Sequence, residues 1–142
     1  MHTFPALYIH IVFSTSARRG LISDHIRPDL HAYLGGILRN IGVTALAIGG
    51  TTDHVHLLVD MKPDLSVADL VRLAKCNSSK WITESTGRWF AWQRGYGAFS
   101  VSRSSLPAVA RYVREQDKHH HGRSSDEEWN ALLSRHGILP PA

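Results

Sequence analysis

Two histidines spaced two residues apart are the first feature of this sequence that could do chemistry. His54 and His56 flank Val55 in the stretch 53–59, which has the aliphatic and β-branched composition of a strand. Because side chains alternate along a strand, both imidazoles project from one face and can meet a single metal ion. The pair alone is a weak signal, since a chain with 10 histidines contains such a spacing by chance. Asp53 beside it orients a histidine ring or ends a turn.

A second pair of reactive side chains lies in the stretch 112–116. Tyr112 and Gln116 are four residues apart, so a helix places them on one face. There they offer a nucleophilic hydroxyl and a further oxygen ligand. Each residue taken alone has a simpler interpretation: a tyrosine that buries its ring and hydrogen-bonds its hydroxyl, and an amide that faces solvent.

Positive charge is concentrated in the middle of the chain. The 142 residues carry 16 Lys and Arg against 12 Asp and Glu, a net charge of +4. Between residues 72 and 123 there are ten basic residues and three acidic ones, and four aromatic residues lie among them: Trp81, Trp89, Trp92 and Tyr96. Cations that pair with phosphates and rings that stack on bases are typical of nucleic-acid binding. A solvated basic face above core tryptophans gives the same pattern.

Length and composition predict one globular domain over residues 1–142. With 43% hydrophobic and 20% charged residues, disorder is excluded as the main state. No uncharged apolar run reaches the roughly 20 residues that cross a bilayer, so we expect no membrane span. The N-terminus lacks the pattern of a secretion signal, and the single cysteine, Cys76, cannot form an intrachain disulfide. We therefore expect a cytoplasmic protein.

Hydrophobic periodicity predicts the order strand, helix, strand, strand, helix, strand and then helix. The strands are expected at 7–15, 43–48, 53–60 and 95–102, and the helices over 26–41, 66–82, 105–119 and 126–133. This is the split βαβ order of the ferredoxin-like, RRM-like α+β fold: an antiparallel sheet with helices on one face, here with an added C-terminal helix that bears the tyrosine. We expect His10 to be a satisfied core histidine and Cys76 a small buried residue.

Taken together, these residues resemble the single-tyrosine HUH transposases of insertion sequences, which are related to the REP-associated tyrosine transposases. The family is named after a His-hydrophobe-His motif, which His54-Val55-His56 matches. Stretches 8–15, 92–101 and 112–116 are similar to the first strand, the segment before the last helix and the tyrosine helix of the family. Departures from the family pattern are small. The first strand more commonly begins with Tyr followed directly by His, whereas here Ile9 stands between Tyr8 and His10. The stretch 75–79 also lacks a glycine that is common in the family.

The resemblance implies a DNA transposase that cleaves and rejoins single-stranded DNA at the hairpins of element ends. Tyr112 is then the nucleophile of a 5′-phosphotyrosine intermediate. A divalent metal, Mg²⁺ or Mn²⁺, is held by His54, His56 and Gln116. Because the tyrosine link conserves the energy of the DNA bond, no nucleotide cofactor is needed.

The resemblance also implies partners. Members of the family act as homodimers on single-stranded DNA with hairpin ends, and the sequence leaves open whether Tyr112 acts in cis or in trans. The stretch 119–121, three histidines, is interpreted as helix-end cations or phosphate contacts. Six further cations are candidates for phosphate contacts: Arg72, Lys75, Lys80, Arg94, Arg111 and Lys118.

Three other functions stay open at this point. The first is a non-catalytic module that binds single-stranded nucleic acid, since the same sheet order carries RNA in other proteins. The second is a domesticated relative that cuts chromosomal repeat hairpins. The third is a zinc hydrolase that uses the two histidines and water, which leaves Tyr112 unexplained and for which the sequence offers no obvious carboxylate as the base.

Overall fold

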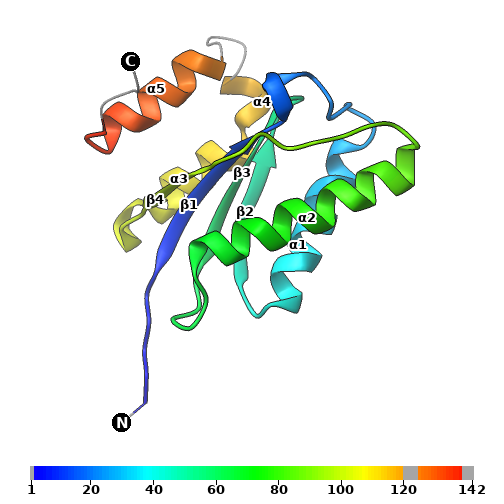
Figure 1. Ribbon diagram of the computed structural model, residues 1–142. Coiled ribbons are helices and arrows are strands. Elements are labelled where there is room, and N and C mark those ends of the chain that lie inside the picture. The colour runs from blue at the N-terminus through cyan, green and yellow to red at the C-terminus, as the bar shows by residue number, and fades with distance from the viewer. Residues whose placement is uncertain (1, 120–124, 139–142) are drawn as a thin grey trace.

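The computed structural model describes residues 2–119 and 125–138 and contains a four-stranded antiparallel sheet (Figure 1). The strand order is β2-β3-β1-β4, so each helix-linked pair of strands encloses a third strand, as the split βαβ pattern requires. The predicted α+β class and element order are confirmed. The strands and helices are β1 (Tyr8–Ser14), α1 (Arg27–Asn40), β2 (Thr44–Gly50), β3 (His54–Asp60), α2 (Val67–Thr86), β4 (Gly97–Ser100), α3 (Leu106–Arg114), α4 (Gln116–His119) and α5 (Ser125–Arg135), with short 3-10 turns η1 (Ser16–Arg18) and η2 (Arg103–Ser105).

Helices α1 and α2 cover one face of the sheet, where the main core lies. Alternate strand residues such as Phe13, Val55 and Leu57 point into this layer and are almost completely buried. Helix α2 is capped, as predicted, by Ser66, whose hydroxyl accepts a hydrogen bond from the backbone amide of Asp69 at 3.0 Å. Burial of aliphatic side chains on both sides of this layer supplies the main stabilisation of the fold.

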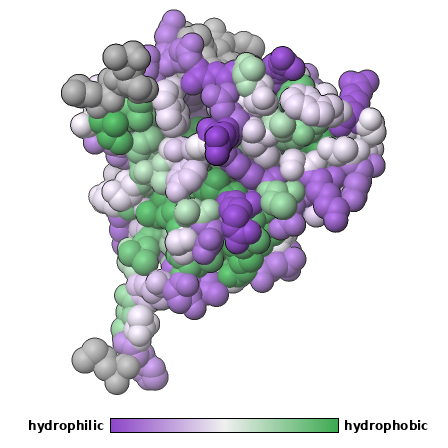
Figure 2. Space-filling view, viewed as in Figure 1, coloured by the Kyte–Doolittle hydropathy of each residue, from purple (hydrophilic) through white to green (hydrophobic). Residues whose placement is uncertain are grey.

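The C-terminal helices cover the other face, which carries His54 and His56. Helix α3 packs through Ala110 and Val113 on β2 and β3, and α5 packs through Leu132 and Leu133 on β1 and β4. In the view of Figure 1, hydrophilic residues dominate the end of the molecule where η1 and α4 lie (Figure 2). Helix α3 therefore lies over the histidine strand, and α5 lies over the neighbouring strands β1 and β4.

A glycine allows the close approach of α3 to the sheet. Gly49 of β2 pairs with His56 of β3, and a Cβ atom at position 49 would fall well inside the radius of the carbonyl oxygen of Val113. Any larger residue would therefore push α3 away. The missing side chain brings the helix that carries Tyr112 close to the strand that carries His54 and His56.

Two sequence predictions about the helices differ from the structure. The helix expected over 105–119 is divided at Glu115, where φ is −103° and ψ is 27°, so that α4 begins at Gln116. Cys76, expected to be buried, is exposed, because the buried stripe of α2 runs along Leu70, Ala74 and Ser78 and position 76 lies off it. The histidines at 120 and 121 lie outside the described residues.

The prediction about membrane spans agrees with the helices that the structure describes. Within residues 2–119 and 125–138 no helix is both long and apolar enough to cross a bilayer.

Candidate metal and tyrosine site

Strand β3 presents His54 and His56 side by side, as the sequence predicted. Both are almost completely buried, and their ring centroids lie 5.0 Å apart. Val55 between them points into the opposite layer and is fully buried. The strand pairs with β1, which places His56 beside Val12 and His54 beside Ser14.

Asp53 holds the ring of His54. The Nδ1 atom of His54 donates to Oδ1 of Asp53 at 2.7 Å, and the Thr51 hydroxyl lies within 2.9 Å of the same nitrogen. Burial alone lowers the pKa of His54, but the hydrogen bonds with the carboxylates of Asp53 and Glu128 outweigh it and raise the pKa to about 9. Asp53 therefore takes the first of the two roles that the sequence allowed, and Nε2 of His54 points into the site.

His10 of β1 holds the ring of His56 in the same way. Its Nε2 lies 2.8 Å from Nδ1 of His56, and the two rings are stacked. Burial, with the charge of His56 adding to it, lowers the pKa of His10 to about 3, so His10 is neutral at physiological pH. The sequence predicted a satisfied core histidine. His10 is buried and satisfied, and the residue it contacts belongs to the site.

Helices α3 and α4 bring Tyr112 and Gln116 to the histidines. Gln116 is fully buried, and its Oε1 accepts a hydrogen bond from Nε2 of His54 at 3.2 Å. Its amide nitrogen donates to the backbone carbonyl of Tyr112, also at 3.2 Å. The ring of Tyr112 meets His56 edge to face, with centroids 5.7 Å apart. The structure therefore brings together the four residues that the sequence singled out.

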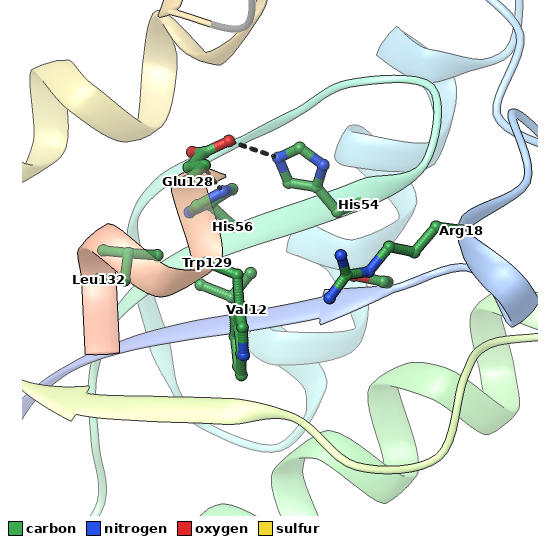
Figure 3. Close-up of a pocket in the computed structure, with 8 residues that line it drawn as sticks. Val12, Arg18, His54, His56, Glu128, Trp129 and Leu132 are labelled. Carbon is green, nitrogen blue, oxygen red and sulfur yellow. Dashed lines mark ion pairs between the residues drawn. The ribbon is translucent and has the colours of Figure 1, made fainter. Parts of the chain in front are cut away.

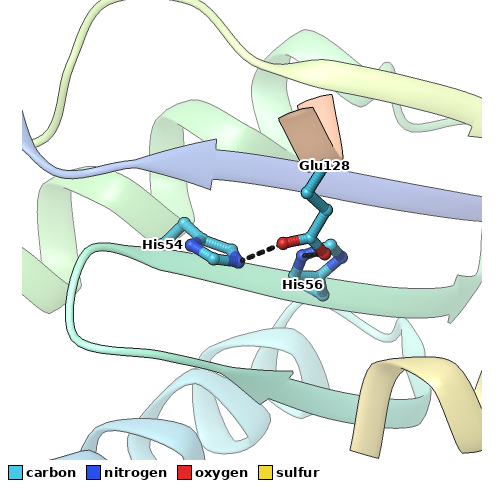
Figure 4. A group of neighbouring side chains, drawn as sticks. All are labelled: His54, His56 and Glu128. Carbon is cyan, nitrogen blue, oxygen red and sulfur yellow. Dashed lines mark ion pairs between the residues drawn. The ribbon is translucent and has the colours of Figure 1, made fainter. Parts of the chain in front are cut away.

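The site contains one more polar residue, Glu128 of α5, which the sequence analysis missed. Its carboxylate lies between the two histidines, 3.5 Å from Nε2 of His54 and 3.4 Å from Nε2 of His56 (Figure 4). It also accepts a hydrogen bond from the hydroxyl of Tyr112. No spacing rule points to this residue, because it lies in an exposed-looking acidic stretch of another helix.

These contacts change the acidity of the groups involved. Burial on its own raises the pKa of Glu128, but its hydrogen bonds with His54, His56 and Tyr112 hold that pKa well below its ordinary value. Burial, followed by the hydrogen bond to Glu128, raises the pKa of the Tyr112 hydroxyl. Tyr112 is therefore protonated and Glu128 ionised in this arrangement.

The side chains fit a divalent cation. The ligand atoms of His54, His56 and Glu128 all lie within 4.8 Å of one another, and the amide oxygen of Gln116 adjoins them. Two imidazole nitrogens with oxygen ligands suit first-row divalent metals, including Mn²⁺, and the oxygens suit Mg²⁺. Each imidazole is also supported on its far nitrogen, as is usual for metal-bound histidines. The cluster is a possible metal site.

The six predicted phosphate-binding cations do not share one surface. Arg94 lines a pocket of about 160 Å³ together with Tyr96 and Arg18, and Arg18 also lines the cavity beside the histidines. Arg72, Lys75 and Lys80 lie on α2, across the sheet from the site, and Arg111 is exposed on α3. The ammonium group of Lys75 donates to the backbone oxygens of residues 93 and 95 at 2.7 and 2.6 Å. Lys118 belongs to α4, but its side chain lies outside the described part of the structure.

The four aromatic residues of the basic segment divide into two kinds. Trp81 stacks on the ring of Tyr33, and Trp92 packs against Phe13 and donates to the hydroxyl of Ser78. Trp89 and Tyr96 are 62% and 42% exposed. Of the four, these two are exposed, whereas Trp81 and Trp92 are half-buried.

Comparison with known proteins defines the class. Residues 3–116, which include the sheet and the His54-Val55-His56 strand, match the family described as "Transposase IS200 like". The chain belongs to this family, which confirms the resemblance seen in the sequence. The matched region ends at Gln116, so α5 and its Glu128 lie beyond it.

Individual relatives are distant. The chain is 21% identical over 117 residues to the ISDra2 transposase TnpA of Deinococcus radiodurans, covering 78% of this chain and 84% of that protein. It is 27% identical over 115 residues to the transposase for insertion sequence element IS200 of Salmonella typhimurium, covering 75% and 74%. Both relatives are transposases.

Two solved structures share the fold. The crystal structure of a D. radiodurans protein assigned as a transposase has a TM-score of 0.65 and 21% identity, covering 80% of this chain and 93% of that one. A REP-associated tyrosine transposase bound to a REP hairpin has a TM-score of 0.56 and 14% identity, covering 80% and 67%. At these identities the likeness concerns the fold.

Proposed function

We propose that this protein is a metal-dependent DNA transposase that cleaves and rejoins single-stranded DNA at element-end hairpins through a 5′-phosphotyrosine on Tyr112. The observation that carries the proposal is the position of the Tyr112 hydroxyl in the cluster of His54, His56 and Gln116, although these residues come from three different elements. A module that only binds nucleic acid does not need this convergence. Membership of the transposase family adds independent support.

The residues of the chain divide the work of the reaction. His54, His56 and Gln116 would hold Mg²⁺ or Mn²⁺, while Asp53 and His10 fix the two rings. The divalent ion, when bound, polarises the scissile phosphate and stabilises the negative charge that develops on it. This fixed arrangement orients the reacting phosphate relative to the tyrosine. The reaction needs no nucleotide cofactor, because the phosphotyrosine conserves the energy of the DNA bond.

Tyr112 performs the covalent step. Because its pKa is raised, the hydroxyl loses its proton only as its oxygen attacks phosphorus. The new bond joins that oxygen to phosphorus, the bond from phosphorus to the 3′ oxygen breaks, and the leaving 3′ oxygen takes up a proton. The phosphotyrosine keeps the energy of the broken bond, so a second 3′-hydroxyl can attack it and rejoin the strands.

Binding of the DNA strand is part of the same proposal. Arg94 lies beside the site and is the first of the predicted cations expected to contact a phosphate, with the exposed ring of Tyr96 next to it. The tyrosine and the histidines of one chain meet here, which supports action in cis within each subunit of a homodimer. A DNA-bound protein of this kind would work at the nucleoid.

The test is a covalent adduct. Purified protein is incubated with labelled single-stranded DNA carrying the hairpins that flank its gene, with Mg²⁺ or Mn²⁺, and is then denatured. We expect a labelled protein band that disappears in Tyr112→Phe and in a chelator. Tight binding to the correct DNA without an adduct would instead identify a non-catalytic binding module.

The geometry favours one second candidate, a metal-dependent hydrolase that uses water. Glu128 supplies the carboxylate beside His54 and His56 that the sequence did not reveal. The same experiment separates the two functions, because a hydrolase gives cut DNA without a protein adduct and does not need the hydroxyl of Tyr112. A domesticated repeat-hairpin nuclease would form the adduct on chromosomal repeat hairpins rather than on the flanking DNA.

A further inference from the structure

Helix α5 closes the candidate site. The space left between Arg18, the two histidines and the side chains of Glu128 and Trp129 is a cavity of about 20 Å³ (Figure 3). A cavity of this size holds about one water molecule. With α5 in place, it has no room for the phosphodiester of a DNA strand.

Glu128 lies where the reacting phosphate is needed. Its carboxylate faces Nε2 of His54 and Nε2 of His56 and accepts a hydrogen bond from the Tyr112 hydroxyl. These are the same groups that the proposed reaction directs at the scissile phosphate. A carboxylate and a phosphate both present negatively charged oxygens to such groups, so one can replace the other.

A second acidic residue of α5 neutralises a cation of the same region. Asp126, in the first turn of α5, forms an ion pair with the guanidinium of Arg18. Arg18 also lines the neighbouring pocket that contains Arg94 and Tyr96. Ala17 and Arg18 have φ values of 54° and 52°, in the left-handed region that residues other than glycine seldom adopt. A strained turn therefore holds the arginine at the edge of the site.

Apart from the polar contacts of Glu128 and Asp126, a small apolar cluster holds α5 on the sheet. Trp129 packs over Gly97, where an added Cβ would lie only 2.7 Å from the indole ring, and against Phe99. Leu132 and Leu133 complete this cluster on the sheet. One 11-residue helix supplies them, and the segment that joins it to the rest of the chain crosses residues 120–124. A helix held by so few side chains can be displaced by a competing ligand.

We propose that α5 is an intramolecular mimic of the DNA strand, in which Glu128 replaces the scissile phosphate and Asp126 replaces a neighbouring phosphate that Arg18 binds. The proposal rests on the function given above. It adds that the resting protein is autoinhibited, that DNA binds by displacing α5, and that Arg18 is a phosphate contact. The first turn of α5 carries three acidic residues. Their negative charge is attracted by the same positively charged groups that would bind the DNA phosphates, so the helix can occupy the DNA-binding surface.

Two variants that break the same ion pair test this idea. Binding of the labelled single-stranded DNA is measured in a chelator, so that neither metal nor catalysis contributes. Asp126→Asn frees Arg18 for the DNA, and we expect about two- to five-fold tighter binding, the range of a partly exposed ion pair. Arg18→Gln also frees α5 but removes the phosphate contact, so binding should weaken, with a salt dependence smaller by about 0.7 in slope.

Glu128→Gln extends the test to the centre of the site. It should bind DNA more tightly in the chelator, whereas Glu127→Gln, which removes the same charge from the next residue, should not. Affinity for Mn²⁺, measured by calorimetry, should persist in Glu128→Gln. Loss of Mn²⁺ affinity without tighter DNA binding would make Glu128 a permanent metal ligand and would overturn the mimic.

The outcomes separate this proposal from the proposed function. If Asp126→Asn and Arg18→Gln change DNA affinity in the same direction, or leave it unchanged, α5 is only a structural helix and the mimic is wrong, even if the tyrosine adduct forms. If the two variants diverge as expected but no adduct forms, the mimic stands and the catalytic function fails. Thermal unfolding of each variant verifies that it is folded.

Discussion

Replacing Gly49 with alanine is expected to separate the tyrosine helix from the histidine strand. A Cβ at this position would overlap the carbonyl oxygen of Val113 and lie 2.8 Å from its carbonyl carbon. Both atoms belong to the backbone of α3, so no side-chain rotation relieves the overlap. The end of α3 must therefore retreat by about 1 Å.

The magnitude follows from the contacts at that end of the helix. Gln116, the first residue of α4, follows Val113 by three positions, and its Oε1 lies 3.2 Å from Nε2 of His54. A retreat of about 1 Å takes this contact beyond hydrogen-bonding distance and misplaces Tyr112 by a similar amount. Misplacements of this size cost about a hundred-fold in rate, and overpacking costs about 1–3 kcal/mol of stability. We expect both effects in Gly49→Ala.

The assay is the rate of adduct formation in a single turnover, with thermal unfolding measured alongside. Gly36→Ala is the matched control, because Gly36 lies in α1 with no atom within 4 Å of an added Cβ. The control should keep the wild-type rate and gain up to about 1 kcal/mol from helix propensity. A folded Gly49→Ala protein that forms the adduct at the wild-type rate would refute the argument.

Three further predictions concern stability and metal binding. Burial, together with the charge of Arg27, lowers the pKa of His31 from 6.5 to about 4, so the unfolded chain takes up this proton first. The free energy of unfolding should therefore decrease as the pH is lowered from 6.5 to 4. In denaturant titrations it should depend less on pH in His31→Gln than in the wild-type protein; the same pH dependence in both proteins would contradict the lowered pKa of His31. Ser66→Ala removes the cap of α2 and should cost about 1 kcal/mol, seen as a lower melting temperature, whereas Ser66→Asp should retain most of the stability. Asp53→Asn removes the carboxylate that orients His54 and should weaken Mn²⁺ binding about ten-fold in calorimetry; an unchanged affinity would show that the ring is fixed without it.

The sequence by itself determined the elements and two parts of the site. Alternation along β3 placed His54 and His56 on one face, and helical spacing placed Tyr112 and Gln116 together, because both patterns depend only on local backbone geometry. The order of the elements then predicted the sheet order, since few topologies connect them without crossing. The order of motifs along the chain was sufficient to identify the family.

Only the tertiary structure decided which other residues join these four. His10 reaches His56 because β1 pairs with β3 in one particular register, and Glu128 reaches both histidines because α5 packs on the sheet through Trp129 over Gly97. Contacts between elements distant in sequence depend on packing of the whole molecule, and no local period encodes them. The exposed position of Cys76 and the break before Gln116 have the same origin, because packing selects which side of a helix is buried and where the helix ends.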